Sequence, residues 1–193
     1  MHARPQMAVR NKEGALALQK LGFSRVVLAR ELSLPEIKEI AAIPGLETEA
    51  FIHGALCYSY SGLCLFSSLE AGRSANRGKC LYPCQAEFDG DAGKKHYFSM
   101  KDMALEKDVL NMPVTSLKIE GRKKTALYVA AVTDYYRRLL DGKDVANRAE
   151  NIKQIFSRPW CKFHFNGRDK SVIERDFVGH RGLKIGKIER LGK

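Results

Sequence analysis

Hydrophobic positions follow an alternating helix and strand pattern over the first 56 residues. Asn11 and Ser33 are of the types that open helices, and Gly22 is suited to end the first one. Ser33 also forms a capping box with Glu36. The pattern predicts helices over 11–22 and 33–45 and strands over 23–29 and 47–53. Helices and strands in this order are typical of a parallel sheet in an α/β protein.

The regular pattern stops between residues 54 and 95. Gly, Ser, Asn, Pro and four of the five cysteines are concentrated in this stretch. A loop of about 40 residues is unusual inside a compact domain unless it has a function. Beyond it, 96–99 predicts a brief strand and 99–102 has the pattern of another helix cap. We therefore expect a functional, cysteine-rich loop at 54–95.

The second half predicts one strand over 114–119 and one long helix over 125–140. The helix has apolar residues at i, i+3, i+4, i+7 and i+11, and Tyr135 lies on that face. We therefore expect Tyr135 in the core and not on a stacking surface. About four strands of the α/β part are visible, and a closed (β/α)₈ barrel needs about twice as many. The chain is either a smaller open α/β unit or a partial TIM-type barrel, and we favour the partial barrel.

This division predicts three parts. Residues 1–142 would form the partial α/β barrel with its cysteine-rich loop, and 143–157 a linker or short helix. Residues 158–193 would begin a small basic β module, opening with a hairpin near Val178. The composition, 45% hydrophobic and 28% charged, excludes wholesale disorder. No apolar run approaches the ~20 residues that cross a membrane, and no signal-peptide pattern begins the chain. We expect a cytoplasmic protein.

The net charge of +11 is concentrated in the second half. Residues 1–90 contain 10 Lys and Arg against 9 Asp and Glu, whereas residues 91–193 contain 23 against 13. Basic side chains that neutralise phosphates release condensed counterions, so this asymmetry favours a polyanionic partner. A solvated basic face without a partner is the alternative.

Four cysteines lie within 28 residues, with the spacing C-x6-C-x15-C-x3-C. They are Cys57, Cys64, Cys80 and Cys84. In a reducing compartment such cysteines do not form structural disulfides, and soft thiolates suit zinc or an iron–sulfur cluster. The spacing matches neither the common zinc patterns nor the usual ferredoxin runs, so unrelated buried or redox-active thiols are the alternative. Cys161, far away in sequence, is expected to be a small buried hydrophobe.

Polar residues follow the end of the strand at 114–119. Lys118 and Glu120 alternate onto one face, and Arg122 comes just past them. This arrangement suits the binding of a carboxylate or phosphate, because arginine offers a two-pronged fork. A structural ion pair at the rim of the barrel is the alternative.

Two other strand ends carry candidates. Arg30 and Glu31 follow the strand at 23–29 and form a similar pair, a candidate for cofactor binding or again a structural ion pair. His53 ends the strand at 47–53. It is either a hydrogen-bonded strand-end histidine or a general base in catalysis.

These residues belong to ordered motifs that resemble the collagenase-like peptidases, the family catalogued as U-thirty-two. The matching blocks are EAFIHGALC at 49–57 with GLC at 62–64, NRGKC at 76–80 with PC at 83–84, SLKIEGR at 116–122 and GHRG at 179–182. The resemblance extends over nearly the whole chain. Within the family, the subgroup that hydroxylates a cytidine of 23S ribosomal RNA is the most similar.

The resemblance implies a TIM-type barrel and a 4Fe-4S cluster on cysteines of this kind, with prephenate as cosubstrate and oxygen source. It also implies that residues 2–6 fall inside a barrel strand. The first barrel strands and everything after Lys193 would then be missing. We expect a truncated chain, whose full-length parent is the active enzyme.

Three classes of function are open. The first is an iron–sulfur enzyme that hydroxylates C5 of a pyrimidine in RNA, with Lys118, Glu120 and Arg122 binding a small carboxylate or the RNA. The second is the peptidase that the family name implies, although no nucleophile–base pair or zinc-protease motif can be named. The third is a zinc-stapled module that binds RNA without catalysis.

Overall fold

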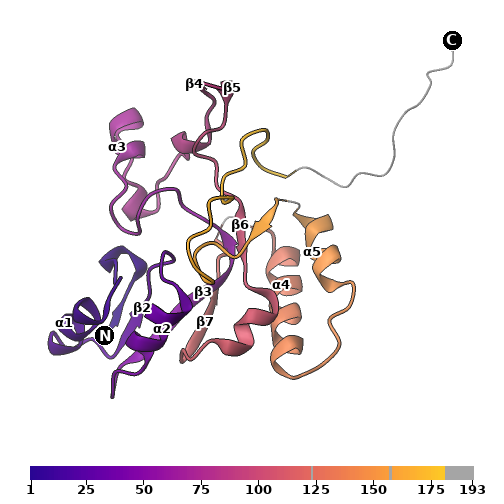
Figure 1. Cartoon of the computed structure of the whole chain (residues 1–193). Coiled ribbons are helices and arrows are strands. Elements are labelled where there is room, and N and C mark those ends of the chain that lie inside the picture. The colour runs from indigo at the N-terminus through magenta and orange to yellow at the C-terminus, as the bar shows by residue number, and fades with distance from the viewer. Residues whose placement is uncertain (123, 157, 181–193) are drawn as a thin grey trace, which may run out of the picture.

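Residues 1–122, 124–156 and 158–180 are described by a computed structural model of the chain (Figure 1). Its helices are α1 (Lys12–Lys20), α2 (Leu34–Ala41), α3 (Phe66–Ala71), α4 (Ala126–Leu140) and α5 (Arg148–Ile155). Its strands are β1 (His2–Ala3), β2 (Arg25–Val27), β3 (Glu47–Ala55), β4 (Phe88–Gly90), β5 (Gly93–Lys95), β6 (Asp102–Ala104), β7 (Ser116–Ile119) and β8 (Trp160–Cys161). Short 3₁₀ turns occupy Pro5–Met7, Ala75–Arg77, Pro83–Gln85 and Glu106–Asn111. Within these ranges no helix is both long and apolar enough to cross a membrane.

The central sheet is mixed but mostly parallel. In the sheet β1 pairs with β2, β2 with β3, and β3 with β7, and all three pairs are parallel. β6 runs antiparallel to the last residues of β3, and β8 pairs in parallel with β6. The α/β class predicted from the sequence is confirmed. In the described part of the chain the sheet stays open, and no closed barrel forms.

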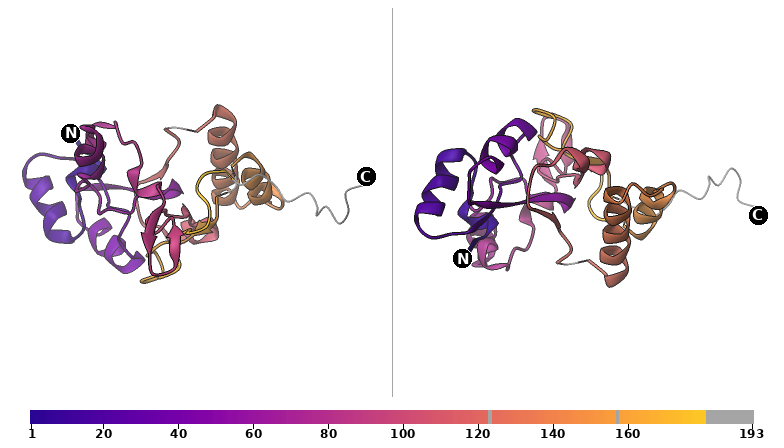
Figure 2. Two further views of the ribbon diagram at one scale, coloured as in Figure 1. Left: turned by 90° about the horizontal axis from the view of Figure 1, so that it is seen from above. Right: turned by 90° about the horizontal axis from the view of Figure 1, so that it is seen from below.

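Helices lie at both ends of this sheet. α1 and α2 pack beside β2 and β3, and α4 packs beside β7 with α5 next to it. Two further views show the first two helices and the last two at opposite ends of the molecule (Figure 2). The cysteine-rich loop, which connects β3 to β6, lies over one end of the central sheet (Figure 1).

The predicted caps of the first two helices are confirmed. The Asn11 side chain accepts a hydrogen bond from Gly14 N at 2.9 Å and opens α1. The Glu36 carboxylate accepts from Ser33 N at 2.7 Å, completing the capping box of α2. These local bonds satisfy backbone donors that a helix start leaves free, which explains why the sequence located both helices.

α4 carries the largest apolar face of the second half. Tyr128, Val132, Tyr135, Tyr136 and Leu139 are all buried. The prediction that Tyr135 belongs to the core is therefore confirmed. The Thr125 hydroxyl caps this helix by accepting from Tyr128 N at 3.2 Å.

The predictions at 96–99 and 99–102 are wrong. Residues 96–99 form a turn, because Ser99 N donates to His96 O. Asp102 does not cap a helix but begins β6, where its backbone N donates to Pro159 O at 2.9 Å. Its carboxylate is buried 3.4 Å from the Arg158 guanidinium. A tertiary partner therefore overrides the local capping pattern.

The loop expected at 54–95 contains short elements that its sequence pattern did not reveal. α3, two 3₁₀ turns and the β4–β5 hairpin occupy it. The first residues of the predicted terminal module, Trp160–Cys161, form β8 and join the central sheet. The predicted hairpin near Val178 extends into residues 181–193, which lie outside the described residues.

Candidate active site

Charged side chains meet where the parallel strands end, as expected for the carboxyl edge of such a sheet. Arg30 lies beyond β2 and Glu120 beyond β7, and their Nη2 and Oε2 atoms are 3.0 Å apart. The Arg30 guanidinium also lies over the Phe51 ring of β3, 3.7 Å from the ring centre. An ion pair and a cation–π contact thus fix one guanidinium above three adjacent strands.

The burial of Arg30 strengthens the electrostatic interaction of its guanidinium with neighbouring groups. Desolvation lowers the pKa of Arg30, while Glu120, Cys57 and Glu31 act in the opposite direction and favour the charged form. The guanidinium stays charged because arginine ionises far above neutral pH. A partly desolvated cation therefore lies within electrostatic reach of the first cysteine of the loop.

A glycine permits the close approach of β3 and the end of β7. Gly54 has a φ of +115°, which disfavours any other residue. A Cβ placed on it would lie 2.7 Å from both the Cβ and the backbone oxygen of Glu120. The absence of a side chain at Gly54 therefore lets Glu120 sit against the strand that leads to Cys57.

Glu31 anchors the loop between the first two cysteines. Its Oε1 accepts from Ser61 N at 2.6 Å and from Ser61 Oγ at 3.1 Å. Arg10 Nη2 donates to Ser61 O at 2.9 Å. Glu31, beyond β2, and Arg10, just before α1, thus hold the turn that separates Cys57 from Cys64.

The four cysteines of the loop act on one another electrostatically. Cys57 is exposed and the other three are half-buried. Desolvation raises the pKa of Cys84 to about 11, and proximity to Cys57, Cys80 and Cys64 adds to the effect. The structure therefore brings all four thiols into one electrostatic neighbourhood, although Cys57 and Cys84 are far apart in sequence.

The thiols are gathered but do not form a closed ligand shell. Among the described residues, no three cysteine, histidine or acidic side chains are arranged to hold a metal ion. The chemistry of the donor set nevertheless fits a soft metal or an iron–sulfur cluster, which takes up to four thiolates. Binding would have to draw the thiols closer together.

Arg122 connects β7 to the cysteine loop. Its backbone N donates to Glu120 Oε1 at 3.2 Å. Its guanidinium packs on Gly78, just before Cys80, so closely that a Cβ there would overlap both terminal nitrogens. Arg122 is exposed, so this guanidinium faces solvent at the edge of the loop.

Lys118 lies on the face predicted for it but is committed to a different partner. Its Nζ is 2.6 Å from Glu49 Oε1 and 5.4 Å from the Phe51 ring centre. Glu120, two residues on, pairs with Arg30 across the same ring. The structure therefore places Glu120 and Arg122 beside the cysteine loop. Lys118 lies farther from the loop, within β7, where it pairs with Glu49.

His53 faces away from this cluster. The pairing of β3 with β7 shifts register between Phe51 and His53, so that Phe51 pairs with Lys118 but His53 pairs with Ile119. The shift turns His53 to the opposite face of the sheet. There it is buried, and its Nδ1 lies 3.2 Å from the Tyr136 hydroxyl.

Burial favours the neutral imidazole of His53. Desolvation, followed by the charge of Lys124, lowers its pKa to about 4. The unfolded chain takes up this proton below about pH 6.5, so the unfolded state binds more protons between pH 6.5 and 4. Stability should therefore decrease as the pH falls through this window, and level off below it.

We expect His53→Gln to remove much of that pH dependence. The glutamine side chain can still hydrogen-bond Tyr136 but does not titrate. Urea unfolding at a series of pH values should give a wild-type free energy of unfolding that falls by on the order of 3 kcal/mol more than the variant's between pH 6.5 and 4. Equal slopes for the two proteins would show that folding does not lower the pKa of His53.

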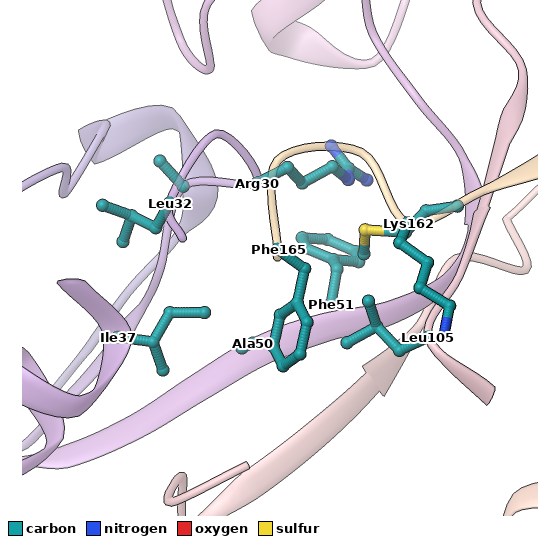
Figure 3. A pocket seen from close by; sticks show the side chains of 10 residues that line it. Arg30, Leu32, Ile37, Ala50, Phe51, Leu105, Lys162 and Phe165 are labelled. Carbon is teal, nitrogen blue, oxygen red and sulfur yellow. The ribbon is translucent and has the colours of Figure 1, made fainter. Parts of the chain in front are cut away.

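A small cavity lies beside the Arg30–Phe51 contact (Figure 3). Its volume is ≈ 10 Å³, space for about one water molecule. Apolar side chains such as Ile37, Leu105 and Phe165 line most of it, and Lys162 lies at one side. The cavity is too small to hold an organic substrate.

Three residues of the cluster were not predicted from the sequence. Ser61 holds the loop through its backbone N and its hydroxyl, and Gly78 does so by having no side chain. No pattern of residue types reveals either role. Tyr82 lies between Cys80 and Cys84 with a φ of +57°, rare for a tyrosine. Desolvation, followed by the charges of Cys80 and Glu120, raises the pKa of its phenol. Its backbone N donates to Cys80 Sγ at 3.3 Å, which places Tyr82 beside the cysteines.

Comparison with known proteins gives consistent matches. The pattern of Peptidase family U32 matches residues 1–174. The chain is 34% identical over 217 residues to the 23S rRNA 5-hydroxycytidine synthase of Escherichia coli, covering 100% of this chain and 33% of that protein. It is 36% identical over 157 residues to tRNA hydroxylation protein P1 of Bacillus subtilis, covering 73% and 37% respectively.

A relative with another kind of name also matches. The collagenase of Porphyromonas gingivalis is 28% identical over 199 residues, which cover 87% of this chain and 48% of that protein. No solved structure matches. The chain spans between about a third and a half of the length of these three relatives.

Proposed function

The chain belongs to peptidase family U32, and from that premise we propose that it forms part of an enzyme that hydroxylates a pyrimidine in RNA. Two relatives are named for hydroxylation of ribosomal or transfer RNA. The first of these matches over the whole chain, and C5 of a cytidine in 23S rRNA is accordingly the proposed target. The chain spans only part of each relative, so the activity belongs to the protein that the complete gene encodes.

The observation that carries this proposal is the Arg30–Glu120 pair beneath the cysteine loop. The pair lies at the carboxyl edge of the sheet, where α/β proteins bind their ligands, and Arg30 reaches Cys57 electrostatically. In this proposal Cys57, Cys64, Cys80 and Cys84 hold a 4Fe-4S cluster. The cluster would supply one-electron redox chemistry at the edge of the sheet. Arg30 would balance the negative charge of the thiolates, and Glu31 would hold the loop in place.

Arg122 is the proposed binding group for a small carboxylate cosubstrate, for which prephenate is our candidate. Its guanidinium is exposed, rests on Gly78 and lies next to Glu120. A carboxylate can accept two parallel hydrogen bonds from such a fork. Lys118 would act indirectly. It would neutralise Glu49 and so help to hold β3 and β7 in register.

The sheet supports a partial TIM-type barrel as the parent fold. Four strands, β1, β2, β3 and β7, follow one another in parallel with α1, α2 and the cysteine loop in the connections. Barrels of this kind carry their active sites at the carboxyl ends of the strands. In the complete protein, further strands would close the sheet. The protein would encounter ribosomal and transfer RNA in the cytoplasm, which is the compartment that we propose for it.

A peptidase is the second candidate, because one relative is named a collagenase. A cysteine nucleophile needs a base within hydrogen-bond reach. His53, at the end of the strand that leads to Cys57, faces the opposite side of the sheet and has a pKa of about 4. The local geometry therefore argues against a Cys57–His53 pair as the catalytic centre of a peptidase.

The test is nucleoside analysis of RNA from cells that lack the complete gene. We expect mass spectrometry to show the loss of one hydroxylated pyrimidine nucleoside, and its return when the wild-type gene is supplied. A strain that cannot make prephenate should lose the same nucleoside. An unchanged nucleoside profile in the deletion strain would refute the proposed function.

A further inference from the structure

Exposed tyrosines are confined to the cysteine loop. Tyr58, Tyr60 and Tyr82 are 52%, 63% and 41% exposed. The remaining four tyrosines are buried or half-buried in the fold: Tyr97, Tyr128, Tyr135 and Tyr136. Exposing aromatic rings costs solvation free energy, so three of them around one set of thiols call for an explanation.

Two of these rings contact a defined neighbour, and the third tyrosine has a constrained backbone. Tyr58 packs edge-on against Phe98, with ring centres 4.9 Å apart. The Arg10 guanidinium lies 4.8 Å from the centre of the Tyr60 ring. Tyr82 has a left-handed backbone, and its amide donates to Cys80 Sγ at 3.3 Å. The rings are therefore pre-organised, which lowers the entropic cost of stacking a ligand on them.

The same loop carries basic side chains that are not neutralised. Arg73, Arg77 and Lys79 are exposed and form no ion pair within the described part of the chain. Glu70 is the single acidic residue between Cys57 and Cys84. The loop is therefore a small basic surface, although residues 1–90 as a whole contain nearly equal numbers of basic and acidic residues.

The basic residues of α4 and α5 differ in this respect. Each lies within ion-pair distance of a carboxylate: Arg137 pairs with Asp141, Arg138 and Arg148 with Asp134, and Lys153 with Glu150. A phosphate would have to compete with these carboxylates. The higher net charge of the second half therefore does not make these helices the better phosphate-binding surface.

We propose that the cysteine loop is itself the RNA-binding surface and that it receives an unpaired segment of RNA. Bases would stack on Tyr58, Tyr60 and Tyr82, while Arg73, Arg77 and Lys79 contact the phosphates. Aromatic rings interleaved with cations are suited to single strands, whose bases are free to stack, and not to a duplex. This inference rests on the proposed function. It identifies the part of the protein that would bring the target base close to the thiols.

Exposed leucines in the same loop offer a way to test a protein partner against RNA. Leu69 on α3 is 81% exposed. An apolar protein surface would depend on Leu69, whereas stacked bases would depend on the tyrosines. Protein interfaces also use tyrosine and arginine, so the three unpaired cations, which match phosphates, are the feature that favours RNA.

The experiment uses the protein that the complete gene encodes and a fluorescent, unpaired pyrimidine-rich RNA oligonucleotide. Fluorescence anisotropy should show that Tyr58→Ala, Tyr60→Ala or Tyr82→Ala each weakens binding about fivefold to a hundredfold, as measured for stacked bases. The matching Tyr→Phe variants keep the ring and should bind almost normally. Leu69→Ala should also bind normally, and the same RNA in a duplex should bind weakly.

Salt dependence tests the cations separately. Each phosphate contact on a single strand contributes about 0.7 to the slope of log affinity against log salt concentration. Changing Arg73, Arg77 and Lys79 together to Gln should therefore reduce the slope by about 2. The same change at Arg137, Arg138 and Arg148, which already have carboxylate partners, should leave the slope unaltered.

Three results would overturn this inference. The tyrosine variants could bind like wild type, Leu69→Ala could weaken binding as much as they do, or the wild type could bind RNA no better than a neutral control protein at low salt. If the deletion strain still lacks the hydroxylated nucleoside in any of these cases, the proposed function stands and only the location of the RNA is wrong.

Discussion

Replacing any one of Cys57, Cys64, Cys80 and Cys84 by serine is expected to abolish iron binding, whereas Cys161→Ser leaves it intact. A serine hydroxyl is a hard ligand that does not ionise near neutral pH, so it cannot replace a thiolate on iron. The four loop thiols share one electrostatic neighbourhood. Losing one should therefore affect the whole centre.

Cys161 is the matched control because it lies in β8 and packs against the core. Desolvation raises the pKa of Cys161 to about 11, as it does for Cys84, but the charged groups that act on Cys161 are Asp169, Lys101 and Asp102 and not the loop thiols. The measurement is iron and acid-labile sulfide per chain after anaerobic purification, together with the visible absorption of the sample. Stoichiometric zinc without iron would refute the cluster and favour a structural zinc site.

Arg122→Ala is expected to lower the rate of RNA modification about a hundredfold while leaving RNA affinity within a factor of about two. The guanidinium is assigned to the carboxylate of the cosubstrate, and misplacing a reactant by about 1 Å can cost a factor of this size. Arg122→Lys should not restore the rate, because lysine lacks the planar fork. Single-turnover rates and anisotropy on the same preparations separate the two effects.

Two further variants support the assignment. Gly78→Ala would push the Arg122 guanidinium from its place, so it should slow modification in the same direction. Arg137→Ala removes an exposed arginine that pairs with Asp141 on α4 and should change neither quantity. If Arg122→Ala reduced RNA affinity as much as the rate, Arg122 would be a phosphate contact and the cosubstrate would bind elsewhere.

The elements with strong local signals were predictable from the sequence. Asn11 and Ser33 form hydrogen bonds to residues only three positions away, so their effect can be seen in a short window. The apolar face of α4 repeats at helical spacing and is buried as predicted. In these places local preference and tertiary packing agree.

The errors occur where long-range pairing decides. Residues 96–102 have the pattern of a strand and a cap, but Lys101 N donates to Val172 O and Asp102 joins the sheet. Strand alternation alone would place His53 on the same face as Phe51. A register shift between the two residues reverses that, and a register shift depends on the partner strand, which a single strand's sequence does not encode.

The candidate site was predictable in its residue types but not in its connections. Arg30 and Glu120 are 90 positions apart and pair at 3.0 Å, and no window of sequence contains both. Glu31 was predicted to pair with Arg30, yet its carboxylate accepts hydrogen bonds from Ser61. The contact between Arg122 and Gly78 depends on the absence of a side chain, which gives no positive signal in a sequence.

Hydroxylation of RNA with the help of the four loop cysteines is the activity that we propose for this protein. The most direct measurement incubates RNA from the deletion strain with the anaerobically purified protein of the complete gene and prephenate, and then counts hydroxylated pyrimidine nucleosides by mass spectrometry. The missing nucleoside is expected to form with the wild type and not with Cys57→Ser. Unmodified RNA, together with cleavage of gelatin or casein that depends on Cys57, would contradict it and establish a peptidase.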